Sequence, residues 1–150
     1  EIILLLEADL EGLRADEIKR ALAGFCRTPD IDMLILRRMN APVLAKLIPG
    51  GTTLFSGERI LYRQDLETVL AQPVSGWQIE SAINEYMSQN GKTVYWVGHS
   101  GQNTFKKEKQ GMGPGLRNDL QTARDIIAPI GVVRLLRLMF TFAKKHLPGV

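Results

Sequence analysis

His99 is the residue of this chain best suited to acid–base chemistry. It is one of only two histidines, and it follows a segment with the composition of a β-strand. An imidazole exchanges protons near neutral pH, and a nearby lysine can stabilise charge on a phosphate. With Ser100, Asn103 and Lys106 close along the chain, His99 is a candidate catalytic residue of a small metal-independent ribonuclease, with a structural role as the alternative. The other histidine, His146, is expected at an exposed or helix-capping position.

The segment around His99 also resembles the turn that carries the nucleophile of α/β-hydrolases. That turn needs Gly-x-Ser-x-Gly after a strand, and the sequence here is Gly98-His99-Ser100-Gly101-Gln102. Gln102 occupies the position of the last glycine, and little chain follows to supply an aspartate and a histidine in that order. We therefore exclude a hydrolase of this class.

Positive charge is concentrated in the C-terminal half of the chain. Residues 76–150 carry ten Lys and Arg against five Asp and Glu, whereas residues 1–75 carry nine against eleven. The formal net charge of the whole chain is only +3. An asymmetry of this kind indicates an anionic partner for the C-terminal half.

Two groups of basic residues are the candidate contacts to nucleic-acid phosphates. One group lies in a glycine-rich loop before a predicted helix start, where backbone N–H groups can approach an anion closely. The other forms a narrow stripe on the predicted C-terminal helix. The candidates are Lys106, Lys107, Lys109, Arg117, Arg134, Arg137, Lys144 and Lys145. The alternatives are a charged surface loop and a core helix, buried on most sides, whose few surface positions are basic.

Aromatic residues lie next to this basic region. Tyr95 and Trp96 occupy adjacent positions of a predicted strand, and Phe105 follows in the loop. Because adjacent strand residues face opposite sides, one of the pair is expected in the core and the other is presented outward. An outward aromatic beside lysines could stack on a base, with ordinary packing as the alternative.

Four carboxylates lie near the predicted ends of the two N-terminal strands: Glu7, Asp9, Asp30 and Asp32. In a parallel pair of strands, such side chains can converge on a divalent metal. Asp30 and Asp32 are therefore the candidate metal ligands, with helix capping and solvation as the alternative. No other feature predicts a cofactor.

The order of short motifs in the N-terminal half carries a resemblance. Asp30-Ile31-Asp32 is followed by Arg37-Arg38, Ala41-Pro42 and Gly50-Gly51. In this order, residues 2 to about 62 resemble the later part of a minimal nucleotidyltransferase domain. The Gly-Ser turn and first Asp-x-Asp pair of that family are absent, and only Glu1 lies near their place. The resemblance implies a diverged nucleotidyltransferase-like domain centred on Asp30 and Asp32.

The elements that must position these residues follow from hydrophobic spacing. Strands over Ile2–Glu7 and Ile31–Leu36, with a helix over Ala15–Phe25 between them, predict a parallel βαβ unit. Gly57-Glu58 predicts a β-hairpin joining Thr52–Ser56 to Arg59–Arg63. The remaining predictions are helices over 41–48, 65–71 and 77–88, a strand over 93–97, a loop over 98–115 and a long helix over 116–147 with a kink at Pro129.

Composition predicts one α+β domain over residues 1–150, rich in helix, with the long C-terminal helix on a small mixed sheet. The chain has 45% hydrophobic and 23% charged residues, which are ordinary globular values. Cys26 is the only cysteine, so disulfides and cysteine-based metal sites are excluded, and a reducing, cytoplasmic location is expected. Two arginines and a proline within residues 126–143 argue against a membrane span.

The function expected from these features is nucleic-acid binding through phosphate contacts. Such binding is mostly electrostatic and has little sequence specificity, and RNA and DNA remain equally open. The alternatives are a protein-interaction module of a larger assembly, a small nuclease centred on His99, or a diverged nucleotidyltransferase-like domain. The chain begins at Glu1 without a methionine, so a mature product or a piece of a larger protein is expected.

Overall fold

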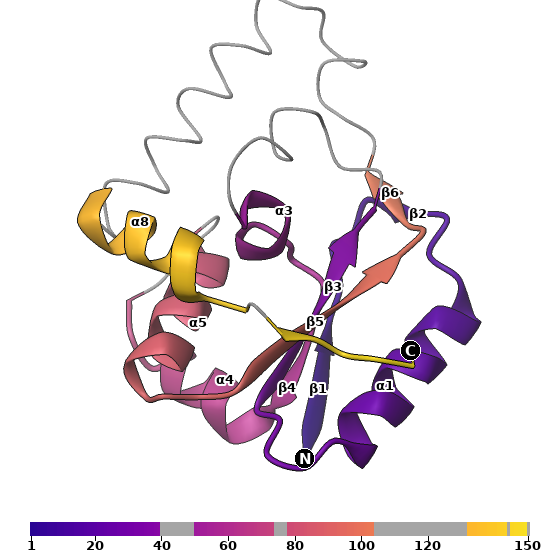
Figure 1. Ribbon diagram of the computed structural model, residues 1–150, viewed down its shortest axis with the longest axis horizontal. Helices are drawn as coiled ribbons and strands as arrows, with labels where there is room; N and C mark the ends of the chain where they lie inside the picture. Colours follow the sequence, from indigo (N-terminus) through magenta and orange to yellow (C-terminus); the bar gives the residue numbers. More distant parts are fainter. Residues whose placement is uncertain (40–49, 74–77, 104–131, 144, 150) are drawn as a thin grey trace, which may run out of the picture.

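A computed structural model describes residues 1–39, 50–73, 78–103, 132–143 and 145–149 of the chain. It confirms the predicted α+β class, with helices on both sides of a small mixed sheet of five strands (Figure 1). Among the described residues, no helix is long and apolar enough to cross a membrane.

The five strands lie in the order β1-β4-β3-β5-β7. Their bounds are Ile2–Leu5 for β1, Arg59–Tyr62 for β4, Met33–Arg38 for β3, Val94–His99 for β5 and Lys145–His146 for β7. β4 is antiparallel to both β1 and β3, whereas β3, β5 and β7 are parallel to one another. A separate two-stranded ribbon pairs β2, Leu10–Glu11, with β6, Gln102–Asn103.

The strands and helix of the predicted βαβ unit are confirmed, with one strand inserted between them. Helix α1 spans Ala15–Arg27, between β1 and β3 in the chain. β1 and β3 run in the same direction because both are antiparallel to β4, which lies between them. Ile60 and Leu61 of β4 have no exposed surface, as expected for a strand with a neighbour on each side.

The first strand of the predicted hairpin is wrong. Gly51–Leu54 forms a short helix, α3, and Gly57-Glu58 leads into β4 without a hairpin turn. Gly50 precedes α3 with φ 70°, a conformation that favours glycine. The buried side chain of Arg59 donates hydrogen bonds to the carbonyl oxygens of Leu54 (3.1 Å) and Ser56 (2.8 Å). In a β-strand these carbonyl oxygens would bond to a neighbouring strand, whereas here the Arg59 side chain supplies the donors.

The two predicted central helices are confirmed. Helix α4 spans Arg63–Leu70 and helix α5 spans Gln78–Gln89. Ile83 and Met87 of α5 are fully buried, as the helical spacing predicts. The predicted helix over residues 41–48 lies outside the described residues.

The predicted C-terminal helix is correct at its centre and wrong at its end. Helix α8 spans Val132–Thr141, and residues 116–131 lie outside the described residues. Ala143 has φ 48°, and the chain then forms β7, where the N–H of Leu147 bonds to the carbonyl of Trp96 at 3.0 Å. The C-terminal residues therefore supply hydrogen-bond partners for the backbone groups on the outer edge of β5. The predicted burial of this helix on most sides is also not found, because Val133, Leu136 and Phe140 are exposed.

The predicted loop over 98–115 is wrong in its first part. Gly98 and His99 complete β5, and Gln102–Asn103 forms β6. These residues pair with β3 and β2, respectively. Residues 104–115 lie outside the described residues.

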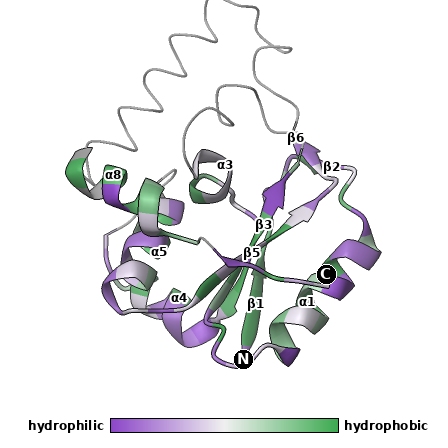
Figure 2. Ribbon diagram, in the orientation of Figure 1, coloured by the Kyte–Doolittle hydropathy of each residue, from purple (hydrophilic) through white to green (hydrophobic). Residues whose placement is uncertain are grey.

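Two apolar clusters pack on opposite faces of the sheet. The α1-side cluster includes Ala21 and Phe25 of α1 with Leu34, Leu36 and Ile60 of the strands. The α5-side cluster contains buried residues of β3, β4, β5, α3, α4, α5 and α8 and the residue after α8, namely Met33, Ile35, Leu61, Val94, Leu54, Val69, Ile83, Met87, Leu138 and Phe142. Figure 2 shows the hydrophobic strands between these helices.

Candidate functional site

A groove runs between the α5–β5 turn, α8 and β7. Its volume is about 370 Å³, within the range of ligand-binding clefts. Lys92, Arg137 and Lys145 line it together with the hydroxyl-bearing residues Ser88, Thr93 and Thr141. None of the described residues that line the groove is acidic. We call this surface the basic groove.

Lys92 is fixed in place at the start of β5. Its ammonium lies 3.1 Å from a carboxylate oxygen of Asp32 and 3.1 Å from one of Asp65. Burial lowers the pKa of Lys92, but the hydrogen bonds to these two carboxylates outweigh it and raise the pKa. Lys92 therefore stays charged, although much of its charge is balanced inside the protein.

Arg137 and Lys145 are the two predicted phosphate contacts whose side chains the structure describes. Arg137 is exposed on α8, and Lys145 is exposed on β7. Within the described part of the chain, neither side chain forms a salt bridge. The Lys145 ammonium lies 5.5 Å from the centre of the Tyr95 ring, directly across in the register of β5 and β7.

The other predicted phosphate contacts lie outside the described side chains. Lys106, Lys107, Lys109, Arg117 and Lys144 belong to undescribed segments. Arg134 lies in α8, but its side chain is not described. The predicted stripe does not form one helix face, because Lys145 belongs to a strand.

Tyr95 and Trp96 face opposite sides of the sheet, as strand alternation predicts. Tyr95 packs against the α1-side cluster and Trp96 against the α5-side cluster, and both are half-buried. The Arg37 guanidinium lies 4.7 Å from the Trp96 ring centre, and the exposed His146 ring meets Trp96 edge-on at 4.5 Å. Phe105 lies outside the described residues.

His99 ends β5 as predicted, but it is buried, with 3% of its surface exposed. Its Nδ1 accepts a hydrogen bond of 3.0 Å from the N–H of Gly101, whereas no partner with good hydrogen-bond geometry reaches its Nε2 from the described residues. A cavity of about 30 Å³ beside it is also lined by Glu17 and Arg20. Burial lowers the pKa of His99, and the carboxylates of Glu58 and Glu17 oppose that effect. The neutral imidazole is therefore the stable form.

A buried polar network lies on the same side of the sheet as His99. Arg38 contacts Glu7 at 2.7 Å and Glu58 at 3.5 Å, and the Ser56 hydroxyl lies 2.7 Å from the second oxygen of Glu58. Burial raises the pKa of Glu7, with Arg38 acting against it. Sequence reasoning missed this network, because its residues come from three separate segments.

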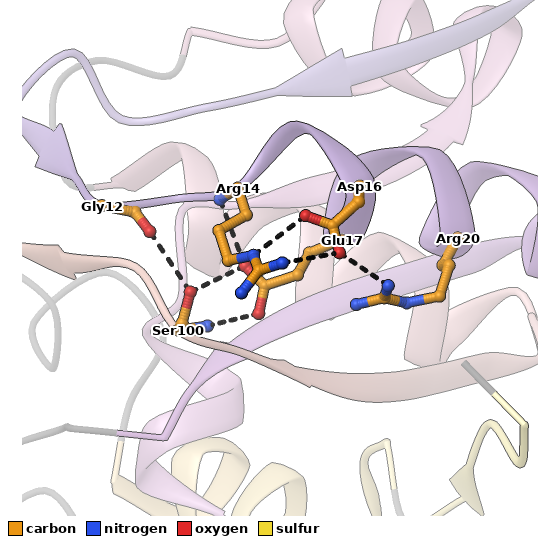
Figure 3. A network of polar contacts seen from close by, with 6 residues as sticks. All are labelled: Gly12, Arg14, Asp16, Glu17, Arg20 and Ser100. Atoms are coloured by element: carbon orange, nitrogen blue, oxygen red, sulfur yellow. Dashed lines mark hydrogen bonds and ion pairs between the residues drawn. The ribbon is translucent and has the colours of Figure 1, made fainter.

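Ser100 is held by the first turn of α1 (Figure 3). Its N–H and hydroxyl bond to the two carboxylate oxygens of Glu17 at 3.0 and 2.7 Å. Burial raises the pKa of Glu17, but hydrogen bonds from Ser100 and the Arg14 N–H outweigh it and lower the pKa. The Ser100 hydroxyl thus serves a structural contact, in agreement with the exclusion of a hydrolase. Asp16 pairs with Arg14 and Arg20 beside this contact.

The candidate metal ligands do not converge with the other carboxylates. Asp30 and Asp32 precede β3, whereas Glu7 and Asp9 follow β1, which runs in the same direction as β3. The two pairs therefore lie at opposite ends of the strands. Asp32 accepts hydrogen bonds from Lys92 (3.1 Å) and from the N–H of Thr93 (2.7 Å). Among the described residues, no group of three His, Cys, Asp or Glu side chains could hold a metal ion.

No protein-family model matches this chain, and no curated protein or solved structure is significantly similar to it. A fold by itself supports many functions. The case for a function therefore depends on the described side chains and on the chemistry that they permit.

Proposed function

We propose that this protein is a nucleic-acid-binding module that contacts phosphates through the basic groove. The observation that carries the proposal is that Arg137 and Lys145 line one open groove together with Lys92, and that none of the described lining residues is acidic. These three residues come from a turn, a helix and a strand. Only the fold brings them together.

The lining suits a phosphodiester backbone. Arg137 is a planar donor that can bind two phosphate oxygens at once, and lysine ammonium groups add charge without directional demands. Hydroxyl groups of Ser88 and Thr93 line the same groove and are common phosphate contacts. These groups read the backbone and not the bases, so the expected binding is weakly sequence-specific.

Catalysis at His99 is less favoured by the geometry. The imidazole is buried, and its Nδ1 is occupied by the N–H of Gly101. A general base must come within hydrogen-bonding distance of its substrate. The exposed side chains of Arg137 and Lys145 can reach a ligand without any change in the protein. His99 could reach a substrate only if the residues that bury it moved away.

The test is fluorescence-anisotropy titration of labelled single-stranded RNA and duplex DNA at several salt concentrations. We expect the Arg137→Gln, Lys145→Gln double variant to bind more weakly than the wild type on every sequence. Its log–log salt slope should be shallower by about 1.4 for RNA or about 1.8 for duplex DNA, since each lost phosphate contact removes about 0.7 or 0.9.

The matched control is Lys19→Gln with Arg27→Gln on α1. Both residues are exposed on α1, which contributes no residue to the described lining of the groove, and their replacement removes the same charge. This control should keep the wild-type slope. Absence of wild-type binding at low salt, or an equal loss in both double variants, would refute the groove as a nucleic-acid site.

A further inference from the structure

β1 forms one end of the sheet that the described strands build. It pairs with β4 on one side, and no described strand pairs with its other side. Its sequence, Ile2-Ile3-Leu4-Leu5, contains no charged residue, proline or glycine. Exposed edge strands usually carry such residues, because unpaired backbone groups of an apolar edge attract another strand. β1 lacks that protection.

The backbone groups that face the outer edge of β1 can be identified from the register. The N–H of Arg63 bonds to the carbonyl of Glu1 at 3.0 Å, and Ile2 lies opposite Tyr62. Hydrogen-bonded and non-hydrogen-bonded pairs alternate along antiparallel strands. Ile3 and Leu5 therefore bond to β4, whereas the N–H and C=O groups of Ile2 and Leu4 point outward.

Apolar side chains accompany these outward groups. Leu4 is 37% exposed, Leu6 is 45% exposed and Tyr62 of the adjacent strand is 38% exposed. Ile2 packs against the α1-side cluster, so strand alternation places Leu4 on that same side of the sheet. Hydrogen-bonding groups and apolar surface thus coincide along one edge.

We propose that this edge pairs with β1 of a second copy of this chain, in antiparallel orientation, so that one continuous sheet spans both copies. Antiparallel pairing about a two-fold axis requires that residues with outward backbone groups face each other. With Leu4 opposite Leu4 of the second copy, Ile2 faces Leu6 of that copy. The even-numbered positions match on both strands, and the exposed leucines meet one another.

Charge at the two ends of the edge is compatible with this pairing. Glu1 lies 2.8 Å from Arg63 at one end, and Glu7 lies 2.7 Å from Arg38 at the other. Antiparallel pairing brings Glu1 near Glu7 of the second copy. Each glutamate has an arginine partner, so the pairing does not bring two carboxylates together without a cation, although Arg38 also contacts Glu58 and Arg63 also contacts Glu67.

The experiment is sedimentation equilibrium of the wild type and of edge variants over about 1–200 µM. We expect a concentration-dependent monomer–dimer equilibrium for the wild type, and a monomer for Leu4→Lys over the same range. Leu4→Pro is a second variant, because proline removes the outward N–H and is tolerated on edge strands. Far-UV circular dichroism checks that both variants keep the fold.

Leu70→Lys is the matched control, because Leu70 is 51% exposed and is the last residue of α4, outside β1 and β4. It should dimerise like the wild type. A wild type that stays monomeric at 200 µM refutes the proposal, and so does a dimer that persists in folded Leu4→Lys and Leu4→Pro. Equal dissociation by Leu70→Lys also overturns it.

Discussion

At the scale of single residues, the hydrogen bonding of His99 couples its protonation state to the fold. Its Nδ1 accepts the N–H of Gly101, so the neutral ring carries its hydrogen on Nε2. A second proton would place an N–H against the N–H of Gly101. The charged groups around the ring are Glu58, Glu17, Arg38 and Arg20. Burial, which lowers the pKa of His99, outweighs the two carboxylates.

This arrangement predicts that stability falls as the solution becomes acidic. Unfolded, His99 binds a proton near its ordinary pKa of 6.5, whereas the folded protein resists that proton to lower pH. The stabilisation is therefore complete above pH 6.5 and decreases as pH falls through that value toward the folded pKa. Urea unfolding at pH 8, 7, 6 and 5 measures the effect, which should be smaller in His99→Gln.

Two carboxyl groups act in the opposite sense and must be separated from this effect. Burial raises the pKa of both Glu7 and Glu80, so their contribution is present at low pH and is lost as pH rises above 4.5. Both glutamates are present in the wild type and in His99→Gln, so their contributions cancel in the difference between the two unfolding free energies. His146→Gln, at an exposed strand position, should keep the wild-type profile. Identical profiles for wild type and His99→Gln would contradict the prediction.

At the scale of elements, Arg59 joins α3, β4 and α5. The guanidinium is fully buried and donates to the carbonyls of Ser56 and Leu54 and, at 2.6 Å, to Oδ1 of Asn84. Burial lowers the pKa of Arg59 to about 10, with Glu80 and Glu58 opposing that effect, so it is charged at neutral pH. One side chain of β4 thus binds backbone acceptors in residues 54–56 and a side-chain acceptor of α5.

Arg59→Leu should therefore reduce the free energy of unfolding by about 3–5 kcal/mol, because it removes the donor to the buried Ser56 carbonyl and Asn84 Oδ1 and the positive charge near Glu58 and Glu80. Urea denaturation at pH 7 measures the loss. Arg63→Leu, which removes an exposed ion pair with Glu1, should cost under about 1 kcal/mol. Comparable losses in the two variants would show that Arg59 does not organise these elements.

The same elements show what local sequence patterns can predict. α1, α5, β3 and β5 follow directly from hydrophobic spacing. α3 does not, because Thr52 and Thr53 have strand propensity and the helix depends on Arg59. β7 cannot be predicted in this way either, because Lys145 and His146 continue a helical pattern in the sequence. They form a strand through their pairing with the edge of β5. Tertiary hydrogen bonds decide both exceptions.

At the scale of the whole molecule, the candidate sites were only partly predictable for a related reason. Arg137 and Lys145 stand out in sequence as part of a basic region, but Lys92 lies in a different part of the chain and joins them only in the fold. The network of Arg38 and Glu58 beside His99 is likewise invisible in sequence. Charge composition favours the C-terminal half, and only the fold brings Lys92, Arg137 and Lys145 to one groove.

The two apolar clusters predict that the described strands and helices unfold as one unit. Leu34 and Ile60 belong to the α1-side cluster, whereas their neighbours Ile35 and Leu61 belong to the α5-side cluster. Alternate residues of the same central strands therefore fill both cores, and neither core can be lost while β3 and β4 remain.

Two probes can report the two faces separately. Trp96 packs against the α5-side cluster, and it becomes the only tryptophan once Trp77, outside the described residues, is replaced by Phe. Cys26, the only cysteine, is exposed on α1 and can carry a fluorophore on the other face. In urea, both probes should give the same midpoint. Leu34→Ala should reduce the unfolding free energy by about 2–5 kcal/mol at both probes, although it alters only the α1-side core. A shift seen by the Cys26 label alone would mean that the two faces unfold independently, and the alternation along β3 and β4 would then not couple them.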